Sequence, residues 1–233
     1  MVQDNNQRWH EAGLSIYGFD LSGIVSRYAM ANQEHLEILK QGVIKWHLWR
    51  NRNPQIKPDL SKADLHGLTL VKAYLSGVNL RGASLTGVNL CEAILTDVDF
   101  GWAKFHSVKL NQAKLQRADL YNADFTNTQL IGANLCGANI IGTNFSSASL
   151  KGANLSGVNI GWAIFGDTDL TGVRGFDAMR YRGPSTIGID TIYRSSGKLP
   201  VDFLFGCGVP NNFISIVPSL AELAGPFQLE DDQ

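Results

Sequence analysis

Large apolar residues recur at every fifth position across half of the chain. From Leu60 to Leu170, all twenty-three such positions hold Leu, Phe or Ile. Two residues before each of them stands a smaller residue, Ala, Val or Thr from Ala63 to Val173, with Leu68 as the one larger member. A short fixed period over this length predicts a solenoid of stacked repeats. Solenoids present surfaces more often than they enclose catalytic pockets, so the period also directs the functional question towards binding.

Each group of five residues predicts one short extended side followed by one corner. The small and the large residue are two apart, the spacing that places both side chains on one face of an extended backbone. The residue between them then points outwards and is usually polar, as at Asp64, Asn79 and Asn134. The other two positions are rich in Ser, Thr, Asn and Gly, as in Ser76-Gly77, and these residues favour tight turns. A period of five matches neither an amphipathic helix nor an ordinary alternating strand.

The phenylalanines indicate how many sides close one turn. Four of them, Phe105, Phe125, Phe145 and Phe165, are spaced by twenty residues. A turn of twenty residues would stack them in one column, where aromatic contacts between coils add to burial. A turn of fifteen residues would scatter them. The spacing therefore predicts four sides per turn.

Segments such as LRGASLTGVNL, LQRADLYNADF and LIGANLCGANI resemble the A(D/N)LxG units of pentapeptide-repeat proteins. The resemblance covers about residues 58–173 and implies an all-β solenoid, a right-handed quadrilateral β-helix, which agrees with the phenylalanine column. It implies nearly six coils. At about 4.8 Å per coil, the rod would be about 28 Å long.

Two segments without the period flank the predicted β-helix. Upstream, the pattern predicts one helix that begins after Asn32 as N-cap and ends at Asn53-Pro54. Residues 31–57 would then form a helical cap that plugs the first coil, because the open end of a solenoid exposes core and unpaired backbone. A partner-binding helix is the alternative. Five residues of this helix share one face: Leu36, Leu39, Val43, Trp46 and Arg50.

Downstream of Val173 the period stops, and residues 174–220 predict a second, helical cap. Ser185 is expected to cap a helix that runs through Arg194, and Pro200 and Pro210 are each expected in a first helical turn. Residues 1–30 form an N-terminal extension that we expect to be weakly ordered. Residues 221–233 form a tail.

The two flanking segments, residues 31–54 and 182–220, are similar to those of a group of bacterial pentapeptide-repeat proteins. Members of this group often continue into a Toll/interleukin receptor-like (TIR) domain. The chain differs at Phe205, where Arg would be more usual, and it ends with AELAGPFQLEDDQ, without a TIR domain. The signalling or NAD-cleaving activity of that domain is therefore not carried over. The resemblance implies instead a platform for a separately encoded TIR protein, or the remnant of a split gene.

Catalytic and metal-binding patterns are missing from the sequence. No nucleophile elbow, P-loop or dinucleotide fingerprint occurs. The histidines share no metal-ligand spacing, and we expect them on the solvated surface: His10, His35, His47, His66 and His106. We expect neither an enzyme nor a cofactor or metal site.

Composition favours a cytoplasmic protein. Cys91, Cys136 and Cys207 are an odd number without paired spacing, which indicates free thiols in a reducing compartment. Residues 1–10 are too polar for a signal peptide, and no apolar run approaches the roughly 18 residues of a membrane span. The net charge of −1 gives no reason to expect nucleic-acid binding.

The family resemblance also implies an alternative function. Some pentapeptide-repeat proteins mimic DNA and bind topoisomerases, which requires an acidic rod that presents charge like a phosphate backbone. Residues 58–173 contain nine acidic and eight basic residues, a net charge of −1. Such a balance makes a poor mimic of duplex DNA.

Coiling the repeats at twenty residues per turn brings four large apolar residues to one outer face. Trp102 and Trp162 share an outward column three coils apart, and Tyr121 and Ile141 occupy the adjacent column between them. Exposed apolar patches often mark interfaces, so these four residues predict a protein-binding face. Self-association or another protein, of unknown identity, would occupy it. The alternative is that residues 1–29 or the C-terminal tail cover it. The function expected from the sequence is a non-catalytic scaffold for protein–protein contact.

Overall fold

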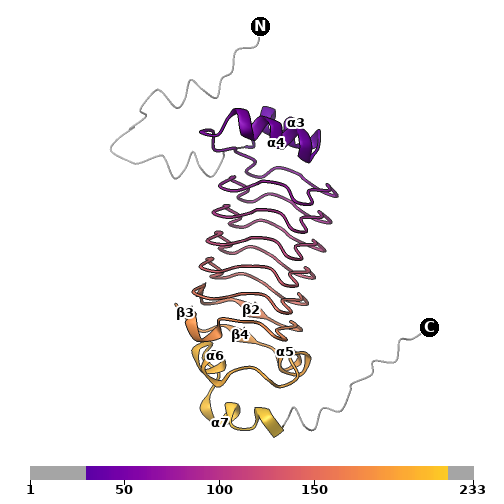
Figure 1. Ribbon diagram of the computed structural model, residues 1–233. Helices are drawn as coiled ribbons and strands as arrows, with labels where there is room; N and C mark the ends of the chain where they lie inside the picture. The colour runs from indigo at the N-terminus through magenta and orange to yellow at the C-terminus, as the bar shows by residue number, and fades with distance from the viewer. Residues whose placement is uncertain (1–29, 220–233) are drawn as a thin grey trace, which may run out of the picture. The chain divides into compact units, whose positions relative to one another are not determined.

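The computed structural model describes residues 30–219 (Figure 1). Residues 1–29 of the expected N-terminal extension and the expected tail 221–233 lie outside the described residues. Of the described residues, 31–219 belong to one compact unit.

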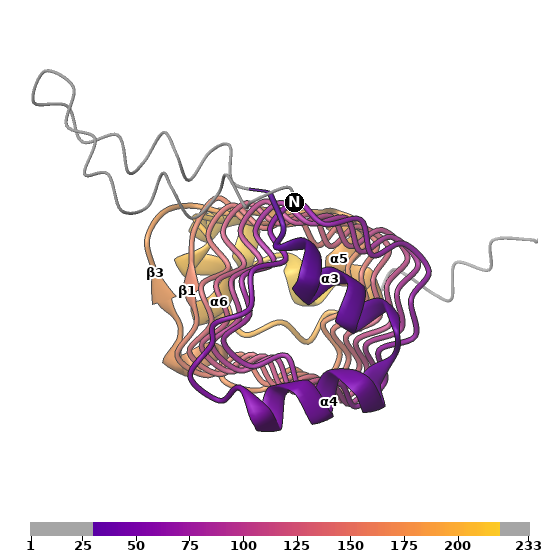
Figure 2. The same ribbon diagram turned by 90° about the horizontal axis from the view of Figure 1, so that it is seen from above.

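The repeats form a stack of four-sided coils. The middle residue of each side makes a parallel bridge to the residue twenty positions later, from Asp59 with Asn79 to Asn154 with Arg174. Backbone hydrogen bonds join successive coils; for example, the Leu80 N–H donates to the Asp99 carbonyl over 2.7 Å. The view along the stack shows the four-sided outline (Figure 2). The solenoid and its twenty-residue turn are thus confirmed.

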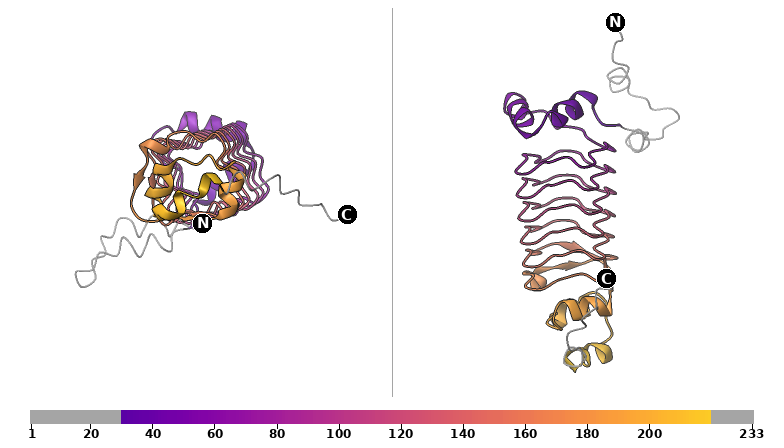
Figure 3. Two further views of the ribbon diagram at one scale, coloured as in Figure 1. Left: turned by 90° about the horizontal axis from the view of Figure 1, so that it is seen from below. Right: turned by 90° about the vertical axis from the view of Figure 1, so that its right-hand side faces the viewer.

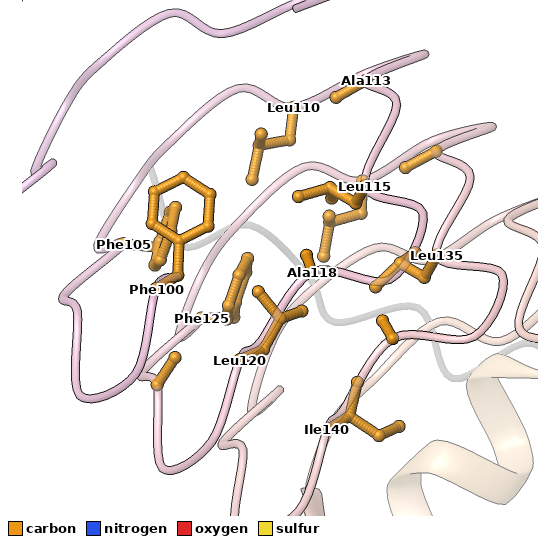
Figure 4. Close-up of a cluster of buried hydrophobic side chains, with 14 of the residues drawn as sticks. Phe100, Phe105, Leu110, Ala113, Leu115, Ala118, Leu120, Phe125, Leu135 and Ile140 are labelled. Carbon is orange, nitrogen blue, oxygen red and sulfur yellow. The ribbon is translucent and has the colours of Figure 1, made fainter. Parts of the chain in front are cut away.

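The inside of the coils is filled by the two apolar columns. All twenty-three large positions from Leu60 to Leu170 are at most 2% exposed. Phe105 and Phe125 stack with ring centroids 4.0 Å apart, and Phe145 and Phe165 continue the column at 5.5 Å intervals. Figure 4 shows Phe105 and Phe125 one above the other among the leucines of neighbouring sides. The phenylalanine column is therefore as predicted.

Every corner of the coils turns through a left-handed residue. At all twenty-three corners from position 62 to position 172, the second corner residue has a φ between 50° and 70°. Ten of these residues are glycine and thirteen are not. This conformation explains the glycines of the pentads, because only glycine adopts it without steric cost.

The outward polar residue of each side stabilises the corner that follows. At twelve sides, an Asp or Asn side-chain oxygen accepts a hydrogen bond from the backbone N–H two residues later. Asn79, for example, accepts from the Arg81 N–H at 3.1 Å. This is an Asx turn, in which the short side chain mimics a backbone turn. The preference for Asp and Asn therefore has a structural cause beyond solvation.

Two helices, not one, precede the coils. α3 (Gln33–Lys40) and α4 (Val43–Arg52) are separated at Gly42, whose φ of 102° is outside the range of a continuing helix. The prediction of a single helix was therefore wrong. Asn32 is the N-cap of α3, as predicted, and accepts from the His35 N–H at 3.1 Å. Asn53 is the C-cap of α4, in agreement with the predicted end.

The helices α3 and α4 bond to the free edge of the first coil (Figure 1). The Asp59 N–H donates to His35 Nδ1 at 3.1 Å, and the Asp59 carbonyl accepts from the Asn32 N–H at 2.9 Å. On another side, the Tyr74 N–H donates to His47 Nε2 at 2.9 Å, and the Tyr74 carbonyl accepts from Trp46 Nε1 at 2.7 Å. These groups make the hydrogen bonds that the backbone of a preceding coil would otherwise make. Leu36, Leu39 and Trp46 join the hydrophobic core.

The chain continues the coil beyond the last pentad. β3 (Arg180–Tyr181) pairs in parallel with β1 (Asn159–Ile160), and β4 (Thr186–Ile187) pairs with β2 (Ile164–Phe165). A 3₁₀ turn, η1 (Phe176–Ala178), precedes β3.

Three short helices follow these strands and lie beyond the last coil (Figure 3). They are α5 (Ile189–Arg194), α6 (Val201–Gly206) and α7 (Asn211–Ile214). The N-cap of α5 is Gly188, so the prediction that Ser185 caps this helix was wrong; the backbone next to Ser185 extends the sheet instead. Pro200 and Pro210 are the N-caps of α6 and α7, one residue before the predicted position.

Candidate functional site

The four residues predicted to bind protein lie along one corner of the coils. We call Trp102, Tyr121, Ile141 and Trp162 the aromatic stripe. Tyr121 and Ile141 are first corner residues, positioned by N–H bonds to Asp119 and Asn139 two residues earlier. The two tryptophans are second corner residues of the same column.

Backbone and ring contacts join the first half of the stripe. The Trp102 N–H donates to the Tyr121 carbonyl in the next coil at 2.9 Å. The two rings meet edge to face, with centroids 5.1 Å apart. Trp102 is 46% exposed, and Tyr121 is half-buried. The structure therefore brings these two predicted residues into direct contact.

A cation holds the other face of the Trp102 ring. The Arg81 guanidinium lies 3.9 Å from the ring centroid, which is a cation–π contact. Arg81 is also paired with Asp99, with 3.4 Å between Nη1 and Oδ1. The ring orientation of Trp102 is thus fixed from both sides, by Arg81 and by Tyr121.

The second tryptophan contacts the segment that follows β3. The Trp162 N–H donates to the Pro184 carbonyl at 2.6 Å. A Cβ on Gly183 would lie only 2.6 Å from Trp162 Cζ2, so glycine is required for the ring to pack there. Trp162 is still 59% exposed. Among the described residues, this C-terminal segment thus lies beside the stripe and leaves most of the Trp162 ring open. Ile141 is half-buried.

Both tryptophans occupy left-handed corners, with φ values of 56° and 52°. A left-handed conformation costs a residue other than glycine about 1–2 kcal/mol. Eleven other non-glycine corners of the stack have the same conformation, so it belongs to the fold and does not by itself mark the tryptophans. The sequence indicated that these residues point outwards, but not that they occupy the strained position of the corner.

The carboxylates of the repeat region are paired with cations or hydrogen-bonded within the coils. The Arg117 guanidinium makes two hydrogen bonds to the Asp97 carboxylate, at 2.7 and 2.6 Å, and they lower the pKa of Asp97. Three more carboxylates of the repeats are in ion pairs: Glu92 with Lys72, Asp99 with Arg81 and Asp167 with Arg194. Asp124 is hydrogen-bonded to His106 at 2.6 Å and accepts the Thr126 N–H at 3.1 Å. The remaining four accept backbone N–H groups in Asx turns: Asp59, Asp64, Asp119 and Asp169.

The other chemistry-bearing residues do not assemble into a second site. Within residues 30–219, no three His, Cys, Asp or Glu side chains gather as metal ligands. The expectation that the histidines are solvated was wrong for His35, which is 8% exposed and accepts the Asp59 N–H. His10 lies outside the described residues. The three cysteines are free thiols, and burial raises the pKa of Cys207 to about 12. None of the described helices is long and apolar enough to span a membrane.

Comparison with known proteins identifies the repeats. Residues 59–172 match the family model of pentapeptide repeats in eight copies. Among solved structures, the chain is 30% identical to HetL, a pentapeptide repeat protein involved in heterocyst differentiation regulation in the cyanobacterium Nostoc sp. strain PCC 7120. The match covers 53% of this chain and 64% of HetL, with a TM-score of 0.39.

Two further solved structures are similar to the chain. A pentapeptide repeat protein from the thylakoid lumen of Arabidopsis thaliana is 31% identical over 40% of this chain and 65% of its own, with a TM-score of 0.39. QnrB1, a plasmid-mediated fluoroquinolone resistance protein, is 16% identical over 74% of this chain and 93% of its own, with a TM-score of 0.30. The chain thus spans just under two thirds of the first two proteins. No curated protein sequence matches it significantly.

Proposed function

Because residues 59–172 form a domain of the pentapeptide-repeat family, we propose that the protein is a non-catalytic scaffold for protein–protein contact. The aromatic stripe is its contact surface, and the cytoplasm is its compartment. The observation that carries the proposal is the exposure of two tryptophans, 46% and 59%, in one column of the rod. Interfaces concentrate binding energy in a few large aromatic anchors.

Three features support the stripe as a binding surface. Arg81 and Tyr121 hold the Trp102 ring in place, so little side-chain entropy is lost when a partner binds. The neighbouring Asp119 and Asn139 form a polar rim. The stripe stands on coils joined by regular hydrogen bonds, and rigid elements position a site more accurately than loops do.

Serine in place of both tryptophans tests the proposal. Ser107 and Ser147 already occupy equivalent left-handed corners, so the double variant Trp102→Ser/Trp162→Ser should keep the coil intact. The tagged full chain is purified from its native host after cross-linking, and co-purifying proteins are identified and then reconstituted from purified components. We expect the double variant to lose the partner. Ile131→Ser is the control, because Ile131 is a 40% exposed corner residue on another column.

The candidate partner is a separately encoded TIR protein. The resemblance of residues 31–54 and 182–220 to segments that flank the repeats in TIR-containing chains supports this choice. The double variant should then fail to bind the purified TIR protein, whereas Ile131→Ser should bind it with unchanged affinity. Equal affinities of wild type and double variant would show that the TIR protein does not bind the stripe.

A further inference from the structure

The corner that carries the aromatic stripe reads nearly the same in both directions along the rod. In successive coils its residue pairs are Gly101-Trp102, Tyr121-Asn122, Ile141-Gly142 and Gly161-Trp162. A Gly-Trp pair stands at each end, and an apolar first corner residue stands at each of the two middle positions. Reversing the direction of the rod about the point halfway between Tyr121 and Ile141 therefore places Trp102 where Trp162 was and Tyr121 where Ile141 was.

An antiparallel two-fold interface would bring like residues of such a surface together, since residue i of one copy meets residue j of the other and the reverse. We propose that the stripe binds a second copy of the same chain, with the two rods antiparallel. Trp102 then packs against the partner's Trp162, and Tyr121 against the partner's Ile141. This inference rests on the proposed role of the stripe as a contact surface.

The outward residues beside the stripe can pair across an antiparallel contact. On one side of the corner, the outward residues of the same four coils are Asp99, Asp119, Asn139 and Asn159. An antiparallel pair places each Asp opposite an Asn of the partner: Asp99 opposite Asn159, and Asp119 opposite Asn139. A carboxylate accepts hydrogen bonds and an amide donates them, so the two flanks are complementary.

On the other flank, Asp124 lies opposite the partner's Asn144, and Lys104 lies opposite the partner's Ile164, which is 39% exposed. A parallel pair would instead place Asp119 of each rod at the level of the partner's Asp124, and Asp99 at the level of the partner's Lys104. The two repulsive carboxylate pairs are then offset by two pairs of opposite charge, so the charges of the flanks alone do not select the orientation.

The size of the stripe sets the strength of the contact. Four partly exposed side chains provide less than the roughly 800 Å² per partner of a standard interface. We therefore expect a reversible dimer that forms at micromolar concentration or above. Sedimentation equilibrium of the full chain over a concentration series should show it. The double variant Trp102→Ser/Trp162→Ser should raise the dissociation constant about tenfold or more, as expected when aromatic anchors are removed. A wild-type protein that stays monomeric throughout would overturn the proposal.

Mixing two single variants separates the two orientations. In an antiparallel dimer of Trp102→Ser, each Trp162 meets a serine, and the same holds for each Trp102 in a dimer of Trp162→Ser. A mixed dimer of one Trp102→Ser and one Trp162→Ser chain restores one complete Trp–Trp contact. We expect the mixture to associate more tightly than either variant alone. In a parallel dimer the mixture would associate more weakly, which would overturn the antiparallel arrangement.

A spin-label distance gives the same answer with the stripe intact. A nitroxide is attached at His66→Cys, an exposed corner position, after Cys91→Ser and Cys136→Ser remove the two accessible thiols. His66 lies about 3.3 coils from the two-fold axis, so the two labels should be about 31 Å apart along the rod at about 4.8 Å per coil. Labels at the same level would overturn the proposal. If the chain is monomeric but the stripe captures a different protein, the second copy is rejected and the scaffold function stands.

Discussion

At the scale of the residue, the pentad divides the chain into positions with distinct physical tasks. The large residue fills the core, the outward Asp or Asn bonds the next corner, and the second corner residue adopts a left-handed φ. Each task explains one column of the repeat. Substitutions should therefore have effects that depend on the column more than on the coil.

The core column is the most sensitive to truncation. Phe125 is fully buried and stacks between Phe105 and Phe145. Phe125→Ala should lower the free energy of unfolding by about 3–5 kcal/mol, because the cavity it leaves cannot close in a packed stack. Urea denaturation measures this change. A midpoint equal to that of wild type would mean that the inward column is wrongly placed.

Alanine substitutions in the outward column should lower the free energy of unfolding only where the side chain is hydrogen-bonded to a corner. Asn154 Oδ1 accepts from both the N–H and the Oγ of Ser156, at 3.0 and 2.7 Å. Asn154→Ala should cost about 1 kcal/mol, the usual net value of a hydrogen bond. Ser149→Ala is the matched control, since Ser149 is outward but makes no side-chain bond among the described residues; it should cost under about 0.5 kcal/mol. Equal losses in the two variants would argue against the Asx turns as a source of stability.

At the scale of the element, the two ends of the coil stack are closed by different chemistry. At the C-terminal end, hydroxyl oxygens of Ser185, Thr191 and Ser195 accept the N–H groups of the last coil. At the N-terminal end, the imidazoles of His35 and His47 accept them. Hydroxyls do not change charge near neutral pH, whereas histidines do. Only the attachment of α3 and α4 should therefore depend on pH.

Acidification should weaken the contact between α3–α4 and the first coil. Burial lowers the pKa of His35 from 6.5; the carboxylates of Glu34 and Asp59 oppose this shift and Arg50 adds to it. A lowered pKa means that the folded state favours the neutral ring. Its stabilisation is complete above pH 6.5 and is lost as the pH falls through the folded-state pKa. A protonated His35 ring also cannot accept the N–H of Asp59 at Nδ1. Hydrogen exchange of the Asp59 amide between pH 8 and pH 5 measures the loss.

One substitution that keeps the acceptor but removes the titration provides the control. In His35→Asn the amide oxygen replaces Nδ1, and asparagine takes up no proton in this range. The variant should retain protection of the Asp59 amide at pH 5. Protection in the wild type that does not change with pH would show that His35 does not hold α3 on the first coil.

At the scale of the whole molecule, the sequence predicted the regular part and missed its two junctions. The coil follows from a period of five and from phenylalanines twenty apart, because identical positions in each coil meet the same surroundings. The break at Gly42 and the strands β3 and β4 depend on the coil edges to which these segments bond. Each edge occurs once, so the repeat pattern of the sequence does not predict them. The aromatic stripe could be predicted from the sequence, because a turn of twenty residues fixes which residues lie above one another on the outside of the coils. The partners of its rings, Arg81 and Gly183, required the structure.

The distribution of charge over the whole rod gives the last prediction, which concerns the alternative of DNA mimicry. A mimic must present unpaired negative charge to a site that binds phosphates. Here all nine carboxylates of residues 58–173 are either in ion pairs or bonded to corner N–H groups, and the net charge of this region is −1. The protein added to a DNA gyrase supercoiling reaction should therefore leave the rate unchanged. The double variant Lys72→Gln/Arg117→Gln removes the partners of Glu92 and Asp97 and brings the region to −3, so it is the more sensitive probe. Inhibition by the wild type that becomes stronger in this variant would establish mimicry and reverse the ranking of the two functions, whereas no effect of either protein supports the scaffold.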